Sequence, residues 1–433
     1  MNDFSETVSV HSIKLPDRPK LLQILGPGLI TGASDDDPSG IATYSQAGAQ
    51  FGYALGWVML FSWPLMCAIQ EISARIGRVT GRGIAGNLKR HYAPSLLYGI
   101  VALLTIANTI NLGADLGAMA AALRLLIGGH QLFYVAVFGL LSILVEVFAR
   151  YSRYVSILKW LTLSLFAYVG VAFMVELPWG TVGFSLVVPD VQWNAGYLTL
   201  LVAILGTTIS PYLFFWQAEE EVEETKERVG AKPLTRAPAQ AAGELWRIRL
   251  DTIIGMGLSN FVALFIILTT AATLHANGIT DIQTSSQAAQ ALRPIAGDFA
   301  FFVFALGIIG TGFLALPVLA GSSAYAIGEA FGWHVGLTRK PRRAKAFYVT
   351  IAVSVAVGGA LNFSPLDPIK ALFWSAVING VVAVPVMFTM MLLSSNTAAM
   401  GNFVLPPVLK SIGWIATVVM VGAAVGMFAT WGG

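Results

Sequence analysis

The sequence has 433 residues, of which 56% are hydrophobic and 11% charged, and its formal net charge is +3. Soluble domains carry about 25% charged residues, so this composition indicates an integral membrane protein and argues against a soluble enzyme or binding domain. The small excess of Lys and Arg fits the positive-inside bias of membrane proteins, and we therefore exclude nucleic acid as a partner. The single cysteine, Cys67, cannot form an intrachain disulfide or a thiolate metal cluster.

The chain begins with a polar segment and continues as long apolar runs. Residues 1–20 lack an apolar core, so they predict a cytoplasmic tail rather than a signal peptide. Residues 21–433 form a predicted transmembrane domain in the lipid bilayer. Its apolar runs predict an all-α polytopic fold with 11 transmembrane helices at 21–47, 53–75, 96–127, 131–149, 155–177, 194–218, 248–275, 298–328, 346–362, 366–393 and 402–430.

The distribution of positive charge predicts the orientation of these spans. Most of the 26 Lys and Arg residues lie in the tail and in the loops after spans 2, 4, 6 and 8. The positive-inside rule then places the N-terminus in the cytoplasm and the C-terminus outside it. We expect the protein in the inner (plasma) membrane of a bacterium.

The first span is interrupted by three consecutive aspartates, Asp35, Asp36 and Asp37, followed by Pro38. One ionised carboxylate at the bilayer centre costs about 2.5–3.5 kcal/mol on insertion scales. No Lys or Arg lies near the middle of the span, so the compensating charge is expected to be a mobile cation. Carboxylates beside unwound backbone carbonyls suit hard divalent cations.

The sixth span has a similar interruption, with Gly206, Thr207, Ser210 and Pro211 at its centre. Two interrupted helices five spans apart predict an inverted repeat of the leucine-transporter type, with the substrate site between the breaks. Repeat one is residues 21–177, repeat two 194–393, and 402–430 is an extra helix. Simple proline kinks are the alternative, but they do not explain three carboxylates.

The three aspartates are not expected to be equivalent. Asp37, directly before Pro38, is the first choice as a metal ligand. Asp35 lies on the same side if the segment is extended. Asp36 either faces solvent or caps the following half-helix.

Four sequence motifs resemble the natural resistance-associated macrophage protein (NRAMP) family of divalent-metal transporters. Residues 37–40 (DPSG) resemble the family's Asp-Pro-Gly-Asn, and 50–53 (QFGY), 70–85 (QEISARIGRVTGRGIA) and 113–118 (GADLGA) resemble further motifs. The similarity covers nearly the whole chain. It implies a secondary transporter that moves divalent metal ions by alternating access, with no enzymatic activity.

The sequence departs from the family pattern at positions that are expected to bind the metal. The family's sixth-span Met-Pro-His is Ser210, Pro211 and Tyr212 here, and a second family histidine is Gln217. Losing the thioether removes a soft ligand, and Gly40 in place of Asn makes room for water. The pattern resembles the NRAMP-related magnesium transporter branch. It implies Mg²⁺, and also Mn²⁺, as transported substrates in hydrated form rather than as cofactors.

The resemblance also implies a ligand set. The metal would be bound by Asp37 and by backbone near Ser34, Gly206, Thr207 and Ser210, with Asp35 as a further candidate. The predicted cavity lining consists of Asp36, Gly40, Tyr212, Gln217 and Asn379. For Asn379, an interhelical hydrogen bond is an equally good interpretation.

Proton coupling depends on groups that this sequence largely lacks. All five histidines lie in the tail, in loops or at span ends, so we expect uncoupled transport. Asp115 either belongs to an ion or proton pathway or pairs with Arg124 or backbone. The alternative function is a proton-coupled Mn²⁺/Fe²⁺ importer of the conventional type. The sequence leaves undecided whether the protein is a channel and which oligomeric state it has. An intramembrane aspartyl hydrolase ranks far below these functions, because the Tyr-Asp and Gly-x-Gly-Asp motifs of that class are absent.

Three further polar features have structural interpretations. The acidic run EEEVEETKE at 219–227 is either solvated or collects cations at the cytoplasmic mouth. Glu71 and Arg75 have the spacing of a helical ion pair. Asn260 is expected to form an interhelical hydrogen bond.

Overall fold

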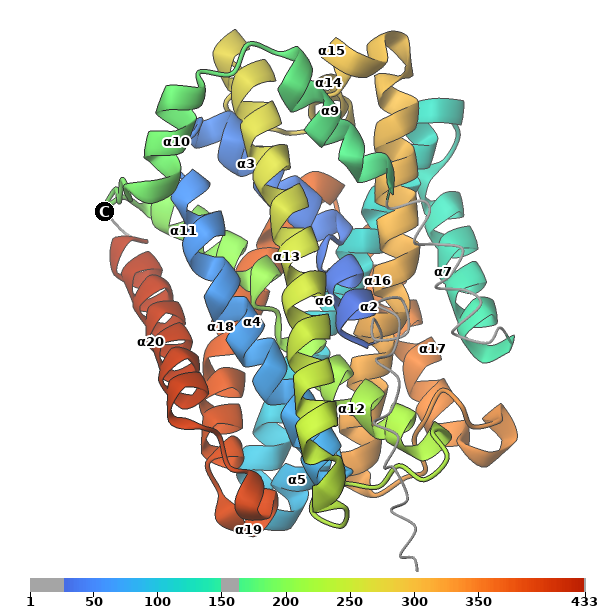
Figure 1. Cartoon of the computed structure of the whole chain (residues 1–433). Coiled ribbons are helices and arrows are strands. Elements are labelled where there is room, and N and C mark those ends of the chain that lie inside the picture. Colours follow the sequence, from blue (N-terminus) through green and yellow to red (C-terminus); the bar gives the residue numbers. More distant parts are fainter. Residues whose placement is uncertain (1–26, 149–162, 432–433) are drawn as a thin grey trace, which may run out of the picture.

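The computed structural model describes residues 27–148 and 163–431, and every regular element within these ranges is helical (Figure 1). This confirms the predicted all-α class. The tail at 1–20, the first residues of span 1 and residues 155–162 of span 5 lie outside the described residues.

Eight predicted spans are helices that are long and apolar enough to cross a membrane, counted over the described residues. They are α6 (Pro94–Ile127), α7 (Gln131–Phe148), the pair α11 (Ala195–Thr208) and α12 (Pro211–Glu227), α13 (Ala241–Thr273), α16 (Ala300–Phe331), α17 (Lys345–Ala360), α18 (Pro368–Ser394) and α20 (Pro407–Thr430).

The other three predicted spans are also helical. Span 1 is the pair α2 (Pro27–Asp35) and α3 (Pro38–Phe51), span 2 is α4 (Gly56–Thr80), and the described part of span 5 is α9 (Phe166–Met174). Short helices connect the spans: α5 (Ile84–His91), α10 (Trp179–Val187), α14 (Ser285–Gln290), α15 (Arg293–Ala296) and α19 (Thr397–Met400).

The two broken helices lie inside the bundle. The most apolar stretch of α11–α12 is 94% buried, compared with 28% for α7 and 44% for α20. In Figure 1, α20 (red) and α7 (teal) accordingly form opposite edges of the bundle. The central helix α13 packs against α2, α3 and α4, and α11 packs against α18.

Glycine pairs bring each broken helix close to its neighbour. A Cβ atom added to Gly32 of α2 would lie 2.8 Å from the Cα atom of Gly255 in α13. A Cβ atom on Gly206 of α11 would lie 2.8 Å from the Cα atom of Gly380 in α18. Small residues permit such close backbone approach, so neither first half-helix can acquire a larger side chain there without moving its neighbour.

Candidate metal-binding site

The first break separates α2 from α3 and is built around Asp37. Pro38 occupies the first turn of α3, where its missing N–H is not needed. Asp37 has the extended backbone (φ −67°, ψ 169°) favoured before proline. Its Oδ1 accepts hydrogen bonds from the Gly40 N–H (2.7 Å) and the Ser39 hydroxyl (2.6 Å). Asp37, and not Asp36, is therefore the residue that caps the second half-helix.

The second break separates α11 from α12 at Ile209 and Ser210. Pro211 opens α12 just as Pro38 opens α3. The Ser210 hydroxyl lies 2.7 Å from the carbonyl oxygen of Gly206 and 2.6 Å from that of Thr207. These carbonyls belong to the last turn of α11 and lack helical partners. The hydroxyl thus satisfies the backbone oxygens that the sequence suggested as ligands.

Side chains from two more helices meet at Asp37. Its Oδ2 accepts a hydrogen bond from the Asn111 amide of α6 (3.0 Å) and lies 3.3 Å from the Tyr212 hydroxyl of α12. The same hydroxyl is 3.3 Å from the carbonyl oxygen of Ser34. The structure therefore brings together Asp37, the Ser34 carbonyl and Tyr212, three of the predicted site groups.

Asp37 is only 1% exposed, and its four donors match the roughly four lone-pair positions of a carboxylate. The two contacts to Oδ1 are short, whereas Tyr212 divides one hydroxyl proton between two acceptors at 3.3 Å. An arriving cation must replace at least one donor, and Tyr212 holds the carboxylate least tightly. Hydrogen bonds thus occupy the whole Asp37 carboxylate, and the bond from Tyr212 is the weakest of them.

Asp35 and Asp36 face a different helix. The Ser259 hydroxyl of α13 lies 2.6 Å from Oδ2 of Asp35 and 3.0 Å from Oδ1 of Asp36. The expectation that Asp35 shares the side of Asp37 through an extended backbone is wrong, because α2 stays helical up to Asp35. Pro38 restricts chiefly the residue directly before it, so the unwound segment is shorter than predicted.

The remaining predicted lining residues have varied surroundings. Gln217 accepts a hydrogen bond from Thr31 (2.5 Å), and Thr207 bonds to the Tyr44 hydroxyl (3.0 Å). The space expected beside Gly40 is filled, since a Cβ atom there would lie 3.2 Å from the Tyr44 ring. Asn379 is buried and forms no described hydrogen bond through its side chain.

Asp115 is fully buried on α6, one helical turn beyond Asn111, and neither carboxylate oxygen has a hydrogen-bond partner among the described residues. The predicted pairing with Arg124 does not occur, because Arg124 is exposed near the end of α6. Asp115 is therefore an unpaired acidic group near the site.

Sequence reasoning missed two residues that act on Asp37. The sequence predicts no role for Asn111 of α6 or for Ser375 of α18. The Ser375 hydroxyl donates to Oδ1 of Asn111 (2.6 Å), which turns the amide N–H₂ toward Asp37. No sequence signal identifies this relay, since it joins three helices that are distant in the chain.

Removing the Asn111 amide is expected to weaken metal binding. Loss of a group that orients a ligand typically costs about 10–100-fold in metal affinity, so Asn111→Ala should weaken Mg²⁺ binding by at least about tenfold. Isothermal titration checks this. The matched control is Asn108→Ala, since Asn108 lies on the same helix but bonds to Ser322, Ser323 and the Leu319 carbonyl. Equal losses in both variants would show that helix packing, not Asp37, is affected.

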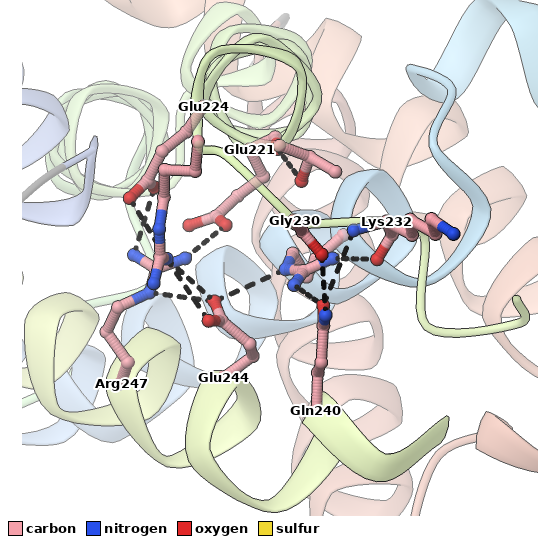
Figure 2. A network of polar contacts seen from close by, with 10 residues as sticks. Glu221, Glu224, Gly230, Lys232, Gln240, Glu244 and Arg247 are labelled. Atoms are coloured by element: carbon pink, nitrogen blue, oxygen red, sulfur yellow. Dashed lines mark hydrogen bonds and ion pairs between the residues drawn. The ribbon is translucent and has the colours of Figure 1, made fainter. Parts of the chain in front are cut away.

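The acidic run at 219–227 is part of a helix and is partly ion-paired. It continues α12 to Glu227, and Glu221 and Glu224 bind Arg247 of α13 at 2.5 and 3.2 Å (Figure 2). Glu244 joins Arg247 at 3.2 Å and Arg78 at 3.3 Å. Three of the six glutamates of the run, Glu221, Glu223 and Glu224, thus form ion pairs. Glu219, Glu221 and Glu223 are buried, which corrects the prediction of a solvated run.

Two smaller predictions are confirmed. Arg75 and Glu71 form an ion pair at 2.7 Å. The Asn260 amide donates to the Met59 carbonyl at 2.7 Å and so links α13 to α4.

Within the described ranges, no three His, Cys, Asp or Glu side chains form a cluster that could hold a metal. A cation at Asp37 would therefore depend on neutral and backbone oxygens.

Comparisons with known proteins identify a family and related sequences. A family model described as natural resistance-associated macrophage protein-like matches residues 28–430. The divalent metal cation transporter MntH of Burkholderia ambifaria is 27% identical over 418 residues, covering 93% of this chain and 87% of that protein. MntH of Klebsiella pneumoniae is 28% identical over 407 residues, covering 92% of each.

Solved structures share the fold. The Eremococcus coleocola manganese transporter, in complex with an aromatic bis-isothiourea substituted compound, has a TM-score of 0.72 at 17% identity and covers 97% of this chain and 90% of that one. Mhp1, a nucleobase-cation-symport-1 family transporter in a closed conformation, has a TM-score of 0.54 at 14% identity, covering 94% and 93%.

Proposed function

Because the chain belongs to the natural resistance-associated macrophage protein-like family, we propose that it transports divalent metal ions across the membrane, with Mg²⁺ as the preferred ion and Mn²⁺ also accepted. The named relatives are divalent metal cation transporters, and the similar solved structure is a manganese transporter. These proteins have divalent metal transport in common. The proposed preference for Mg²⁺ rests on the residues around Asp37.

The observation that carries the Mg²⁺ proposal is the chemistry around Asp37. The oxygen atoms beside its carboxylate are the hydroxyls of Ser39 and Tyr212, with the Ser34 carbonyl next to Tyr212, and no sulfur atom is among its described partners. Hard cations prefer oxygen ligands, and Mg²⁺ is commonly held by one or two carboxylates with several waters retained. Soft metals would gain nothing from these partners.

We propose that the ion binds Asp37 after Tyr212 releases it. The Ser34 carbonyl, which lies 3.3 Å from the Tyr212 hydroxyl, is proposed to bind the ion or one of its waters in place of that hydroxyl. The carbonyls of Gly206 and Thr207 become available when Ser210 turns away from them. Asp35 remains a further candidate: its Oδ2 accepts from Ser259, and its buried Oδ1 has no hydrogen-bond partner among the described residues.

Alternating access follows from the two breaks. Half-helices that end at unwound backbone can move without disrupting a continuous hydrogen-bond ladder. Asp251 of α13 accepts a hydrogen bond from the Gly28 N–H (2.7 Å), and Ser259 holds the other end of α2. We propose that α2 and α13 move together during transport. We also propose that the protein lies in the inner membrane of a bacterium, with its N-terminus in the cytoplasm.

The alternative is a proton-coupled importer of Mn²⁺ or Fe²⁺. Asp115 favours it, because a buried carboxylate without a hydrogen-bond partner can take up a proton. Against it, the predicted site positions contain Ser210, Tyr212 and Gln217 rather than a thioether or an imidazole. We therefore propose transport down the gradient of the metal itself.

Uptake into proteoliposomes separates the two functions. With a metal indicator and a pH dye inside, we expect Mg²⁺ and Mn²⁺ to enter while the internal pH follows that of protein-free vesicles. Mn²⁺ uptake that acidifies the interior, together with no entry of Mg²⁺, would establish the alternative instead.

A further inference from the structure

The segment between α16 and α17 carries a dense group of exposed positive charges. Between residues 332 and 345 the chain turns back toward the membrane through the short 3₁₀ helix Pro341–Arg343. Its cations are all exposed, and we call them the basic loop: Arg339, Lys340, Arg342, Arg343 and Lys345.

These cations differ from three other arginines at this end of the protein. Arg78, Arg228 and Arg247 each form ion pairs with glutamates of α12 or α13. None of the basic-loop side chains has an ion pair or side-chain hydrogen bond with another described residue. Their charge is thus available for a partner outside the protein.

The backbone of this segment is held in place rather than loose. The Leu337 N–H donates to the Tyr325 hydroxyl (3.1 Å), and the Tyr348 hydroxyl donates toward the carbonyls of Leu337 (3.2 Å) and Arg339 (3.0 Å). Thr338 donates to Glu223 of α12 (2.7 Å). The charges are therefore presented from a preformed support, which lowers the entropy cost of binding.

Aromatic side chains indicate that this segment lies at the membrane surface. Phe331, the last residue of α16, is 56% exposed and stacks on Trp333, which is 42% exposed, with 5.3 Å between ring centroids. Exposed aromatic residues at the end of a membrane span are typical of the lipid–water interface. The basic loop follows within a few residues, at the depth of lipid head groups.

We propose that the basic loop binds the phosphate head groups of anionic phospholipids in the adjacent leaflet. Clusters of four to eight Lys and Arg beside a membrane span attract anionic lipid, and arginine binds phosphate through two parallel hydrogen bonds. The stacked Phe331 and Trp333 and the two flanking spans hold the cations where head-group phosphates are concentrated. This site is separate from the metal-binding site and independent of which ion is transported.

Lipid titration of the purified full-length protein, followed by native mass spectrometry, tests the proposal. The probes are phosphatidylglycerol and phosphatidylcholine. The double variant R342Q/R343Q should bind phosphatidylglycerol about 30-fold more weakly than the wild type, from the usual effect of two interfacial charges, and bind phosphatidylcholine equally well. The matched control R293Q/K370Q removes two exposed cations that also lack described ion pairs.

Three outcomes would overturn the proposal. They are unchanged phosphatidylglycerol binding by R342Q/R343Q, an equal loss in R293Q/K370Q, and displacement of the lipid by inorganic phosphate at matched concentration, which would identify a site for free anions. Retention of phosphatidylglycerol binding by R342K/R343K at reduced affinity would support it, since lysine keeps the charge but not the paired hydrogen bonds. Unfolding temperatures in phosphatidylcholine confirm that every variant is folded.

Discussion

Asp37→Asn is expected to weaken Mg²⁺ binding by more than about 100-fold, beyond the usual cost of losing a supporting residue, and to abolish transport. The substitution removes the charge that a divalent cation needs in a low-dielectric interior. It preserves the cap, because asparagine is as good as aspartate at this position and its amide oxygen can still accept from Gly40 and Ser39. The effect therefore reports on charge and not on a broken helix start.

Calorimetric titration of Mg²⁺ and uptake into proteoliposomes measure this effect. Asp36→Asn is the matched control, because Asp36 lies in the same break but bonds to Ser259 instead. It should retain Mg²⁺ binding within a few-fold of the wild type. Similar losses in both variants would mean that the total charge of the break, rather than Asp37, attracts the ion. Unfolding temperatures without metal check that Asp37→Asn is folded, because its new amide N–H₂ faces the Asn111 N–H₂ that donates to Oδ2 in the wild type.

Arg247→Met is expected to lower the free energy of unfolding by about 3–5 kcal/mol, the usual cost of removing one partner of a buried ion pair. Arg247 joins α13 to Glu221 and Glu224 of α12, and the Glu221 side chain is fully buried (Figure 2). Methionine fills similar volume but leaves the Glu221 carboxylate without its cation. The cost arises mainly from this uncompensated charge.

Denaturant unfolding in detergent measures the loss, and a second substitution tests its cause. In Arg247→Met with Glu221→Gln, the buried charge is gone, so most of the lost stability should return. Arg228→Met serves as the control, because the Arg228 side chain is 46% exposed and an exposed pair contributes about 0–1 kcal/mol. If the double variant is no more stable than Arg247→Met alone, packing rather than charge accounts for the loss.

The sequence predicted both breaks because their causes are local. Pro38 and Pro211 cannot continue a helix hydrogen-bond ladder, and each opens a new helix in the structure. Asp37 was favoured over its neighbours for a related reason, namely its position directly before proline. Span positions were also predictable, since an apolar run of about 20 residues has few alternatives in a bilayer.

The extent of the acidic helix was not predictable in the same way. Residues 219–227 were expected to leave the membrane as a solvated run, yet they continue α12. Glutamate is a good helix former, but the run is also held by Arg247 of α13, the next long helix, which pairs with Glu221 and Glu224. Charge balance of this kind depends on which helices are neighbours.

By itself, the sequence determined the membrane class, the spans and the two breaks, with Asp37 at the first of them, because hydropathy, proline and consecutive carboxylates act over a few residues. Only the tertiary structure assigned partners to the aspartates, with Asn111 and Tyr212 at Asp37 and Ser259 at Asp35 and Asp36. The physical reason is that a side-chain hydrogen bond requires its atoms to meet within about 3 Å. Helix rotation and packing set such distances, and neither is encoded in the spacing of residues along one helix.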